Sequence, residues 1–515
     1  MSVRTPFQLF NVSNFVGGVT FLQQRDNECE VMENFELQRD GYLTNRLGTY
    51  KGNSNSIGSA MIVGMDSVGV NFIVAKVGTT FYYYTSPNPP FPVAFSSFTV
   101  PTSPQNSPVR FSAMEDNATG DAIIYMVNRN FTGLLKWVPA AAASAYVASS
   151  PIGEYIHRYN KMLFVAGDPT KPNRLYFSDP GLPDSWPALN YIDISPRHGS
   201  ITGLVGQPGQ LVVFCERAVL SLRGTPPLRY DLDSIHERVG CDNPGSLSTF
   251  GSISYFMFQG ALMELSSSVN LISDSLRNFA ISDPTVNPNL CWGVLTPYYY
   301  LLTYPLNGNG TGGGAAPVVP AAANPVRVMV YDRVRFQAFY HWVYPPTTAL
   351  GALAPVQALM SGPDSRSVAI AGGDGNVYVQ PFRGLADYNY GTHTVPFTLD
   401  ADAAAGTAVM GRWVSRRYDM GSSLIQKAHN RILVAGQGTA NLTVHRYGVD
   451  NTLRTSVLYT AQSLPRDSRQ PSFSGVTGFP RFSDIQFELS GANLIVTDVA
   501  VQWRALRLAG GGTLT

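Results

Sequence analysis

The stretch Ser59–Thr85, SAMIVGMDSVGVNFIVAKVGTTFYYYT, contains three short apolar or aromatic runs separated by turn residues. Val, Ile, Phe and Tyr are enriched in strands, whereas glycine and short polar residues are enriched in the turns that join them. The stretch therefore predicts a small antiparallel meander that ends in an aromatic-rich strand.

The same design recurs along most of the chain. We count about seven units at a spacing of roughly 45 residues, which is the range of four-stranded propeller blades. One meander cannot cover its own apolar faces, so neighbouring sheets must stack around an axis. The repeat predicts an all-β fold with a seven-bladed β-propeller over residues 57–388, in which a Gly-, Ala- and Pro-rich insert at 306–325 lengthens the sixth unit.

The segment Asn34–Thr49, NFELQRDGYLTNRLGT, is predicted to form two short strands joined by a turn at Asp40 and Gly41. A ring of sheets removes its free edges when a strand from the other end of the chain completes one blade. We therefore expect the N-terminal β segment, residues 1–56, to complete the last blade near Val377–Val379.

The repeat ends before the last part of the chain, and a cleaner alternation of apolar and polar residues begins, as in NLTVHRYG and TDVAVQWRAL. Such alternation is typical of antiparallel sheets with one solvated face. Residues 395–515 are therefore predicted to form a separate β-sandwich that serves in assembly. They contain twelve Lys and Arg against eight Asp and Glu, so this domain is mildly basic and the rest of the chain mildly acidic.

Composition excludes several classes of protein. The 36 Lys and Arg nearly balance 35 Asp and Glu, which does not fit a free-standing nucleic-acid-binding protein. The N-terminus lacks the apolar core of an export signal, and the sequence has no apolar run of roughly eighteen residues. We expect synthesis in the cytoplasm and no membrane segment.

No motif in the sequence predicts catalysis, a cofactor or a metal. The cysteines are far apart and are expected to be reduced core thiols, and no two histidines have ligand spacing. GNGTGG satisfies G-x-G-x-x-G but has no crossover helix after it. Two carboxylate pairs could act as acid and base only if the fold brought them together: Asp231 with Asp233, and Glu216 with Glu237.

One cluster is a candidate binding surface. Arginine and aromatic residues alternate at Arg412, Trp413, Arg416, Arg417 and Tyr418, and such clusters bind phosphates or a partner's carboxylates. The alternative is an ordinary solvated strand face on which the arginine stems pack.

Three segments together resemble a family of tailed-bacteriophage tail-tube (nozzle) or packaged-DNA stabilisation proteins. They are the Asn34–Thr49 segment, GDPTKPNRLYFSDPGLPDSWPALNYIDISPRHGSITGLVGQPGQLVVFCERAVLSLRG and RWVSRRYDMGSSLIQKAHNRILV. The family's Lys-Arg-Pro-Gly is Asn-Arg-Leu-Gly here, so the proline is missing. The residues that match the family motifs are Gly41, Arg46, Gly48, Ser178, Asp179 and Trp186.

The resemblance implies a propeller-bearing structural protein of the virion tail. Such a protein would form a homo-oligomeric ring, six-fold by expectation, below the portal and adaptor and beside other tail proteins. Double-stranded DNA would be retained in its lumen and pass through it without sequence specificity, and a weakly charged chain suits a conduit because dense basic lining would grip phosphates. The alternative is a glycan-binding or glycan-cleaving tail propeller for host attachment.

The stretch SDPGLPDSW, which is part of the second of these segments, can also be interpreted as an ordinary turn of a blade. Asp179 is expected to hydrogen-bond the local backbone of a blade turn, and Trp186 to pack beneath the loop.

Overall fold

The computed structural model is an all-β structure, which agrees with the predicted class: its described residues contain thirty-nine strands and two single-turn 3-10 helices. The structure describes residues 8–13, 29–33, 35–37, 43–45, 50–51, 62–68, 72–77, 79–85, 94–101, 109–115, 122–139, 141, 143–273, 292–304, 326–333, 338–344, 359–361, 367–371, 377–381, 410–419, 425–448, 450–464, 481–492 and 494–508.

The chain divides into two compact units. The first unit comprises Met1–Leu47, Met329–Val343 and Gly406–Thr515, and the second comprises Gly48–Val328 and Tyr344–Ala405. The sequence-based boundaries at residues 56 and 388 therefore differ from the observed division. Neither unit is continuous in sequence.

Five antiparallel sheets of the second unit are each built from four consecutive strands. The first two sheets are β6 (Ile62–Val68), β7 (Phe72–Val77), β8 (Thr80–Thr85) and β9 (Ser96–Phe98), then β10 (Arg110–Glu115), β11 (Ala122–Val127), β12 (Leu135–Trp137) and β13 (Ala145–Tyr146). The third is β14 (Tyr155–Tyr159), β15 (Met162–Ala166), β16 (Arg174–Phe177) and β17 (Tyr191–Asp193). The fourth and fifth are β18 (Ile201–Gln207), β19 (Gln210–Cys215), β20 (Val219–Thr225) and β21 (Arg229–His236), then β22 (Ser248–Phe250), β23 (Ile253–Phe258), β24 (Ala261–Leu265) and β25 (Val269–Ser273). The 3-10 helices η1 (Pro196–His198) and η2 (Pro244–Ser246) precede β18 and β22.

Two further groups of strands follow. The first group has the order β26 (Trp292–Leu295), β27 (Tyr299–Tyr304), β28 (Val326–Asp332), β29 (Ala338–Tyr344). The division between the two units falls within β28. The last group is β30 (Leu359–Ser361), β31 (Ser367–Ala371), β32 (Val377–Pro381) and β5 (Tyr50–Lys51). Val379 pairs with Tyr50 and Tyr378 with Lys51. A strand from the N-terminal 56 residues thus completes this sheet at the position where one was predicted.

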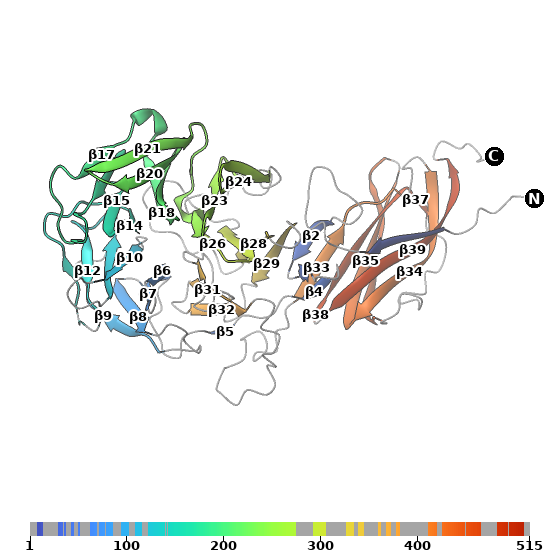
Figure 1. The fold of residues 1–515 in the computed structure, drawn as a ribbon. Coiled ribbons are helices and arrows are strands. Elements are labelled where there is room, and N and C mark those ends of the chain that lie inside the picture. Colours follow the sequence, from blue (N-terminus) through green and yellow to red (C-terminus); the bar gives the residue numbers. More distant parts are fainter. Residues whose placement is uncertain are drawn as a thin grey trace, which may run out of the picture. The chain divides into compact units, whose positions relative to one another are not determined.

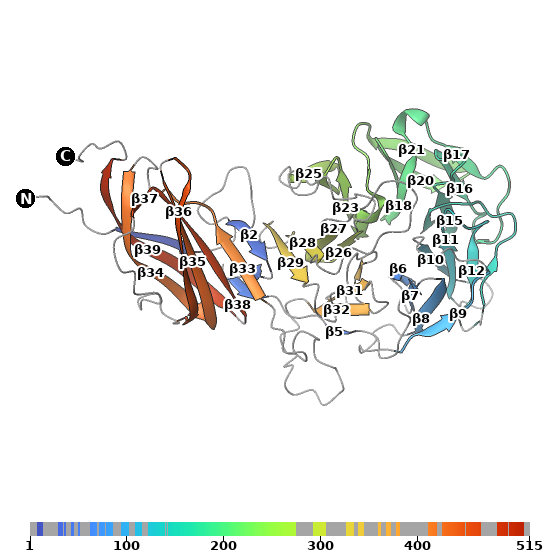
Figure 2. The same ribbon diagram turned by 180° about the vertical axis from the view of Figure 1, so that it is seen from behind.

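The first strands of successive groups are neighbours in a closed order. β6 contacts β10, and the contacts continue through β14, β18, β22, β26 and β30, which contacts β6 again. Buried apolar side chains fill the spaces between sheets; one cluster, for example, joins the β14–β17 sheet to the β18–β21 sheet through Phe164, Phe177, Leu204 and Val213. Figures 1 and 2 show these sheets grouped around a common centre.

The first unit contains two groups of paired strands. One has the order β29, β2 (Cys29–Glu33), β33 (Met410–Ser415), β38 (Asp484–Ala492), β35 (Thr439–Tyr447), β36 (Leu453–Ser463). The other has the order β3 (Phe35–Leu37), β4 (Leu43–Asn45), β39 (Ile495–Leu508), β34 (Ile425–Gln437), β37 (Arg481–Phe482), with β1 (Gln8–Ser13) also paired to β39. Along β35 buried side chains alternate with partly exposed ones, as the sequence alternation predicted.

The N-terminal hairpin was placed wrongly from the sequence. β3 and β4 pair with each other, and Leu43 of β4 pairs with Val496 of β39, so the hairpin belongs to the first unit and does not complete the last sheet of the second. Phe35 and Leu43 are completely buried there. A hairpin pattern specifies an apolar face but not the sheet edge that covers it. Gly41, Arg46 and Gly48 lie outside the described residues.

Three of the four cysteines are buried free thiols, which confirms that prediction for Cys29, Cys215 and Cys241; Cys291 is outside the described residues. Burial raises the pKa of both Cys215 and Cys241 to about 12, so these thiols are poor nucleophiles. No helix in the described part of the chain is long and apolar enough to cross a membrane.

Candidate assembly face

Beyond the end of β33 the chain continues beside β38, and hydrogen bonds to β38 hold this segment in place. The Ser415 hydroxyl donates to the Arg416 carbonyl (2.6 Å) and accepts from the Phe487 amide (3.0 Å). Beyond it, Tyr418 and Ile485 exchange two backbone hydrogen bonds of 2.8 and 3.0 Å. The backbone that carries the predicted arginine cluster is therefore held in one conformation.

The structure separates the five predicted residues into two kinds. Trp413 and Tyr418 are each only 1% exposed and form part of the core of the first unit. Arg412 and Arg416 are partly exposed, and Arg417 is exposed. Within this cluster only the arginines offer surface to a partner, because the two aromatic side chains are buried.

Aromatic rings orient two of the arginines. The Arg417 guanidinium lies 3.8 Å from the centre of the Tyr447 ring and donates a hydrogen bond to the Asn451 side-chain oxygen. The Arg416 guanidinium lies 5.1 Å from the centre of the Tyr418 ring. Cation–π contacts at exposed sites contribute about 0.5–1 kcal/mol each, which is enough to favour one arrangement of a long side chain.

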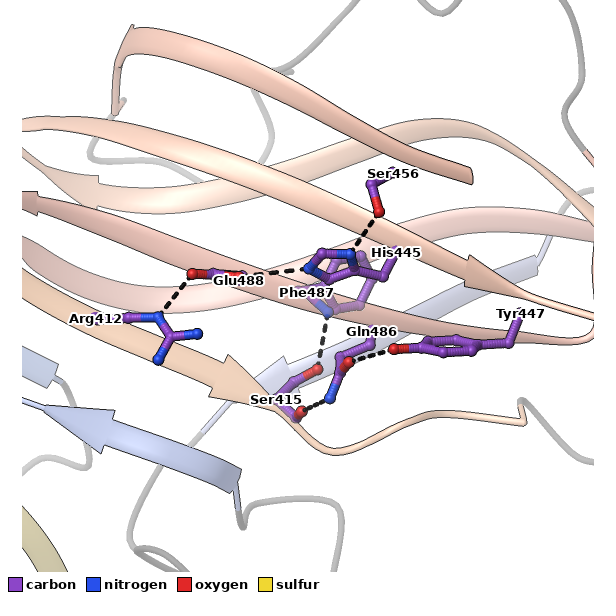
Figure 3. Close-up of polar contacts among 8 residues, drawn as sticks. All are labelled: Arg412, Ser415, His445, Tyr447, Ser456, Gln486, Phe487 and Glu488. Carbon is purple, nitrogen blue, oxygen red and sulfur yellow. Dashed lines mark hydrogen bonds and ion pairs between the residues drawn. The ribbon is translucent and has the colours of Figure 1, made fainter. Parts of the chain in front are cut away.

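Tyr447 is itself fixed. Its hydroxyl donates to Gln486 Oε1 (2.9 Å), and Gln486 Nε2 donates to the Ser415 carbonyl (2.8 Å). Figure 3 shows this second path from Tyr447 back to the end of β33. The ring under Arg417 and the end of β33 are thus parts of one hydrogen-bonded network.

A row of polar side chains crosses four adjacent strands on the same sheet (Figure 3). Arg412 Nε donates to Glu488 Oε1 (2.7 Å), Glu488 Oε2 lies 3.4 Å from His445 Nε2, and His445 Nδ1 lies 2.8 Å from the Ser456 hydroxyl. Partial burial alone would raise the pKa of Glu488, but the hydrogen bond and charge of Arg412, with a smaller contribution from His445, hold it below its usual value.

Ser456, His445 and Glu488 include the side chains of an acyl-transfer triad, but the arrangement differs from that triad in two ways. The serine is bonded to Nδ1 and the carboxylate to Nε2, the reverse of the usual order, and Arg412 already neutralises the carboxylate. The geometry fits a cross-strand brace, in which exposed pairs contribute about 0.2–1 kcal/mol each. Sequence reasoning missed this row because it depends on which strands pair.

The family-motif residues of the second unit form a compact loop. Ser178 is fully buried, and its hydroxyl accepts from the Leu163 amide (3.0 Å). Trp186 is buried, as expected, but the Asp179 carboxylate does not bond the local backbone as predicted: it accepts from the Ser185 hydroxyl (2.6 Å) and the Asn190 amide (2.9 Å). These side-chain partners lie six and eleven residues further along the chain, beyond the reach of a local turn pattern.

The two carboxylate pairs considered from the sequence lie in structural surroundings. Asp231 and Asp233 are exposed on β21, and Asp231 is opposite Arg223 on β20. Glu237 pairs with Arg197 at 3.2 Å. Among the described residues, no group of three His, Cys, Asp or Glu side chains could hold a metal ion.

Comparisons with known proteins add little. No protein family matches the sequence, and no curated protein does. A solved structure entitled "Crystal Structure of Mitotic Checkpoint Complex" matches with a TM-score of 0.39 and 9% identity, over 65% of this chain and 93% of that one. A TM-score this low supports no conclusion about fold or function.

Proposed function

We propose that this chain is a non-enzymatic structural protein of a phage tail. In this proposal the second unit is a seven-bladed β-propeller, and the first unit is a two-sheet β-sandwich that binds neighbouring subunits. Copies of the chain form a ring, six-fold by expectation, below the portal and adaptor proteins. The ring belongs to the tail tube or nozzle, and double-stranded DNA is retained in its lumen and passes through it without sequence readout.

The assembly role rests on one observation, the fixed positions of the Arg416 and Arg417 side chains. Arg416 and Arg417 belong to a segment that hydrogen bonds to β38 hold in place, and Arg417 is stacked on a ring that is itself hydrogen-bonded. Side chains fixed before binding lose less entropy when a partner docks. Arginine above aromatic residues is also the composition that interface cores favour. The phage assignment is supported by the three sequence segments that resemble that family.

The propeller assignment is supported by the closed order of first strands from β6 to β30 and by the pairing of β5 with β32. A closed ring of sheets leaves few free edges, so it can be exposed on a virion without aggregating. Such a ring is closed by its own sheets and does not need the first unit for its stability. This favours a separate role in assembly for the first unit.

The test is to change Arg416 and Arg417 together to Glu in the full chain. We expect a folded monomer by circular dichroism and light scattering, and no rings by negative-stain microscopy, whereas the wild type forms rings. Truncating a buried interfacial charge pair typically costs about 2–5 kcal/mol. The matched control reverses Arg217 and Arg238, which are exposed in the second unit, and should assemble normally.

Normal rings from the Arg416/Arg417 variant would show that these arginines are only a solvated face. A wild-type monomer that binds or cleaves surface polysaccharide would instead favour the alternative, a host-attachment propeller.

A further inference from the structure

Four large apolar side chains are exposed on two segments of the second unit, the loop after β16 and the start of β21 with the turn before it. Leu182, Leu189 and Leu228 are 58%, 82% and 90% exposed, and Tyr230 is also exposed. We call these four residues the leucine rim. Single exposed leucines are common, but a group of them on a protein surface indicates a binding site.

Hydrogen bonds within the loop that carries Leu182 and Leu189 fix its conformation. Asp179 joins its two halves through Ser185 and Asn190, and its carbonyl accepts from the Leu182 amide at 3.1 Å. Beneath the loop, Trp186 is buried in the core that the β10–β13 and β14–β17 sheets share. The two leucines therefore project from a fixed support, which lowers the entropy lost when a partner covers them.

Hydrogen bonds connect this loop to the turn that carries the other two members of the rim. The Gly181 amide donates to the Lys161 carbonyl (2.8 Å), and the adjacent Asn160 side chain donates to the Gly224 carbonyl (2.7 Å). Gly224 pairs directly with Tyr230 across β20 and β21. The loop after β16 and the turn before β21 are thus neighbours, so the rim residues lie on adjacent segments of one unit.

The two units carry net charges of opposite sign, which favours a second copy of the chain as the partner. Counted over the whole sequence, the first unit has eighteen Lys and Arg against thirteen Asp and Glu, and the second has eighteen against twenty-two. The excess is five positive charges on one unit and four negative charges on the other. Net charges of opposite sign on the two units of one chain favour head-to-tail docking of copies.

The first unit also has an exposed apolar strand. β36 is the last strand in its sheet order, and Leu453 and Leu458 on it are 53% and 58% exposed. Arg454, between them, is paired with Asp450 at 2.7 Å. An outermost strand that exposes two leucines fits an apolar surface on another copy.

We propose that the leucine rim of one copy docks on β36 of the next copy. The contact is heterologous, so repeating it generates a ring or an open filament. This inference rests on the proposed ring and specifies which surface of the second unit meets the first unit of a neighbour. It also gives the SDPGLPDSW loop a role beyond its own stability.

The first experiment changes Leu182 and Leu189 together to Asp in the full chain. Light scattering should show the assembled fraction falling by at least about tenfold at equal concentration, with an unchanged circular dichroism spectrum. Leu271→Asp is the matched control, because Leu271 is 49% exposed on β25 of the same unit, and it should assemble like the wild type. Normal assembly of the double variant would overturn the proposal while the ring itself stood.

A second experiment identifies the occupant without relying on a destabilising change. Leu189→Cys in one preparation and Leu458→Cys in a differently tagged one are mixed and treated with a short bis-maleimide. We expect mixed dimers carrying both tags, with the untreated mixture and the wild type as backgrounds. Rings without mixed dimers would show that the rim does not dock on β36. If the wild type forms no oligomer at any concentration, the proposed function fails, and this proposal with it.

Discussion

Acid should destabilise the first unit through one buried histidine. His429 on β34 is completely buried, and its Nε2 accepts from Arg446 Nε (3.0 Å) and Nη2 (2.8 Å). A guanidinium can only donate, so Nε2 must be unprotonated and the ring neutral. Burial, and then the charge of Arg446, lowers the pKa of His429 to about 3.

The sign and size of the effect follow from linkage. The unfolded chain binds a proton at His429 below its ordinary pKa of 6.5, whereas the folded chain does so only near pH 3, so stability falls as the pH drops between these values. At pH 4.5 two pH units of this window have been crossed, which corresponds to a loss of about 2.7 kcal/mol from this group alone. Above pH 7 the contribution is constant.

The perturbation is His429→Gln, which keeps a side-chain acceptor for Arg446 but does not titrate. Urea unfolding followed by circular dichroism at pH 7.5, 5.5 and 4.5 measures the free energy of unfolding of both proteins. The difference between them should shift by about 2.7 kcal/mol in favour of the variant between pH 7.5 and 4.5. Curves that stay parallel over this range would refute the assignment of a neutral, acid-sensitive His429, since all other titrating groups are common to both proteins.

Three further outcomes are expected. Asp179→Ala removes the acceptor for two side-chain donors and should lower the free energy of unfolding of the second unit by about 2–4 kcal/mol, measured by urea unfolding against Asp231→Ala as an exposed control. Arg110→Leu removes a guanidinium 4.9 Å from the Trp292 ring centre, between β10 and β26, and should cost about 1–2 kcal/mol in the same assay. A fragment of residues 395–515, expressed alone, should be insoluble because it lacks β1–β4 and β29, and a soluble fragment with a cooperative transition would contradict the observed division.

The repeated meanders could be predicted because their pairings are local. In the sheet from β6 to β9 each strand pairs with the next, so alternation and turn residues in one short stretch contain most of the information. Closure at Val377–Val379 was predictable for a different reason, since a ring with one open sheet leaves edges that a terminal strand must cover.

The hairpin and the polar row were not predictable because their partners are distant in sequence. Leu43 packs with a strand more than four hundred residues later, and no local pattern distinguishes that edge from an edge of the second unit. The row depends on β33, β38, β35 and β36 being adjacent, an order that differs from their order in the chain. For the arginine cluster the residue types were informative, but the burial of Trp413 and Tyr418 follows from the alternation of faces on a sheet whose orientation the sequence leaves open.

The order of segments along the chain has a consequence for how both units form. β2 pairs with β29 and β33, the β3–β4 hairpin joins β39 through β4, and β5 pairs with β32, so the first strands in the sequence complete sheets whose other strands come last. Local meanders such as β14–β17 can form early, because each pairing closes a short loop, whereas the pairing of Tyr50 with Val379 must close a loop of most of the second unit. The free edges of β32 and β39 therefore stay open longest during folding. These edges are protected from other chains only after β5 and the β3–β4 hairpin have paired with them. Sequence changes that slow or weaken this pairing should therefore favour aggregation more than changes elsewhere. This holds even though the two segments contribute few of the buried side chains.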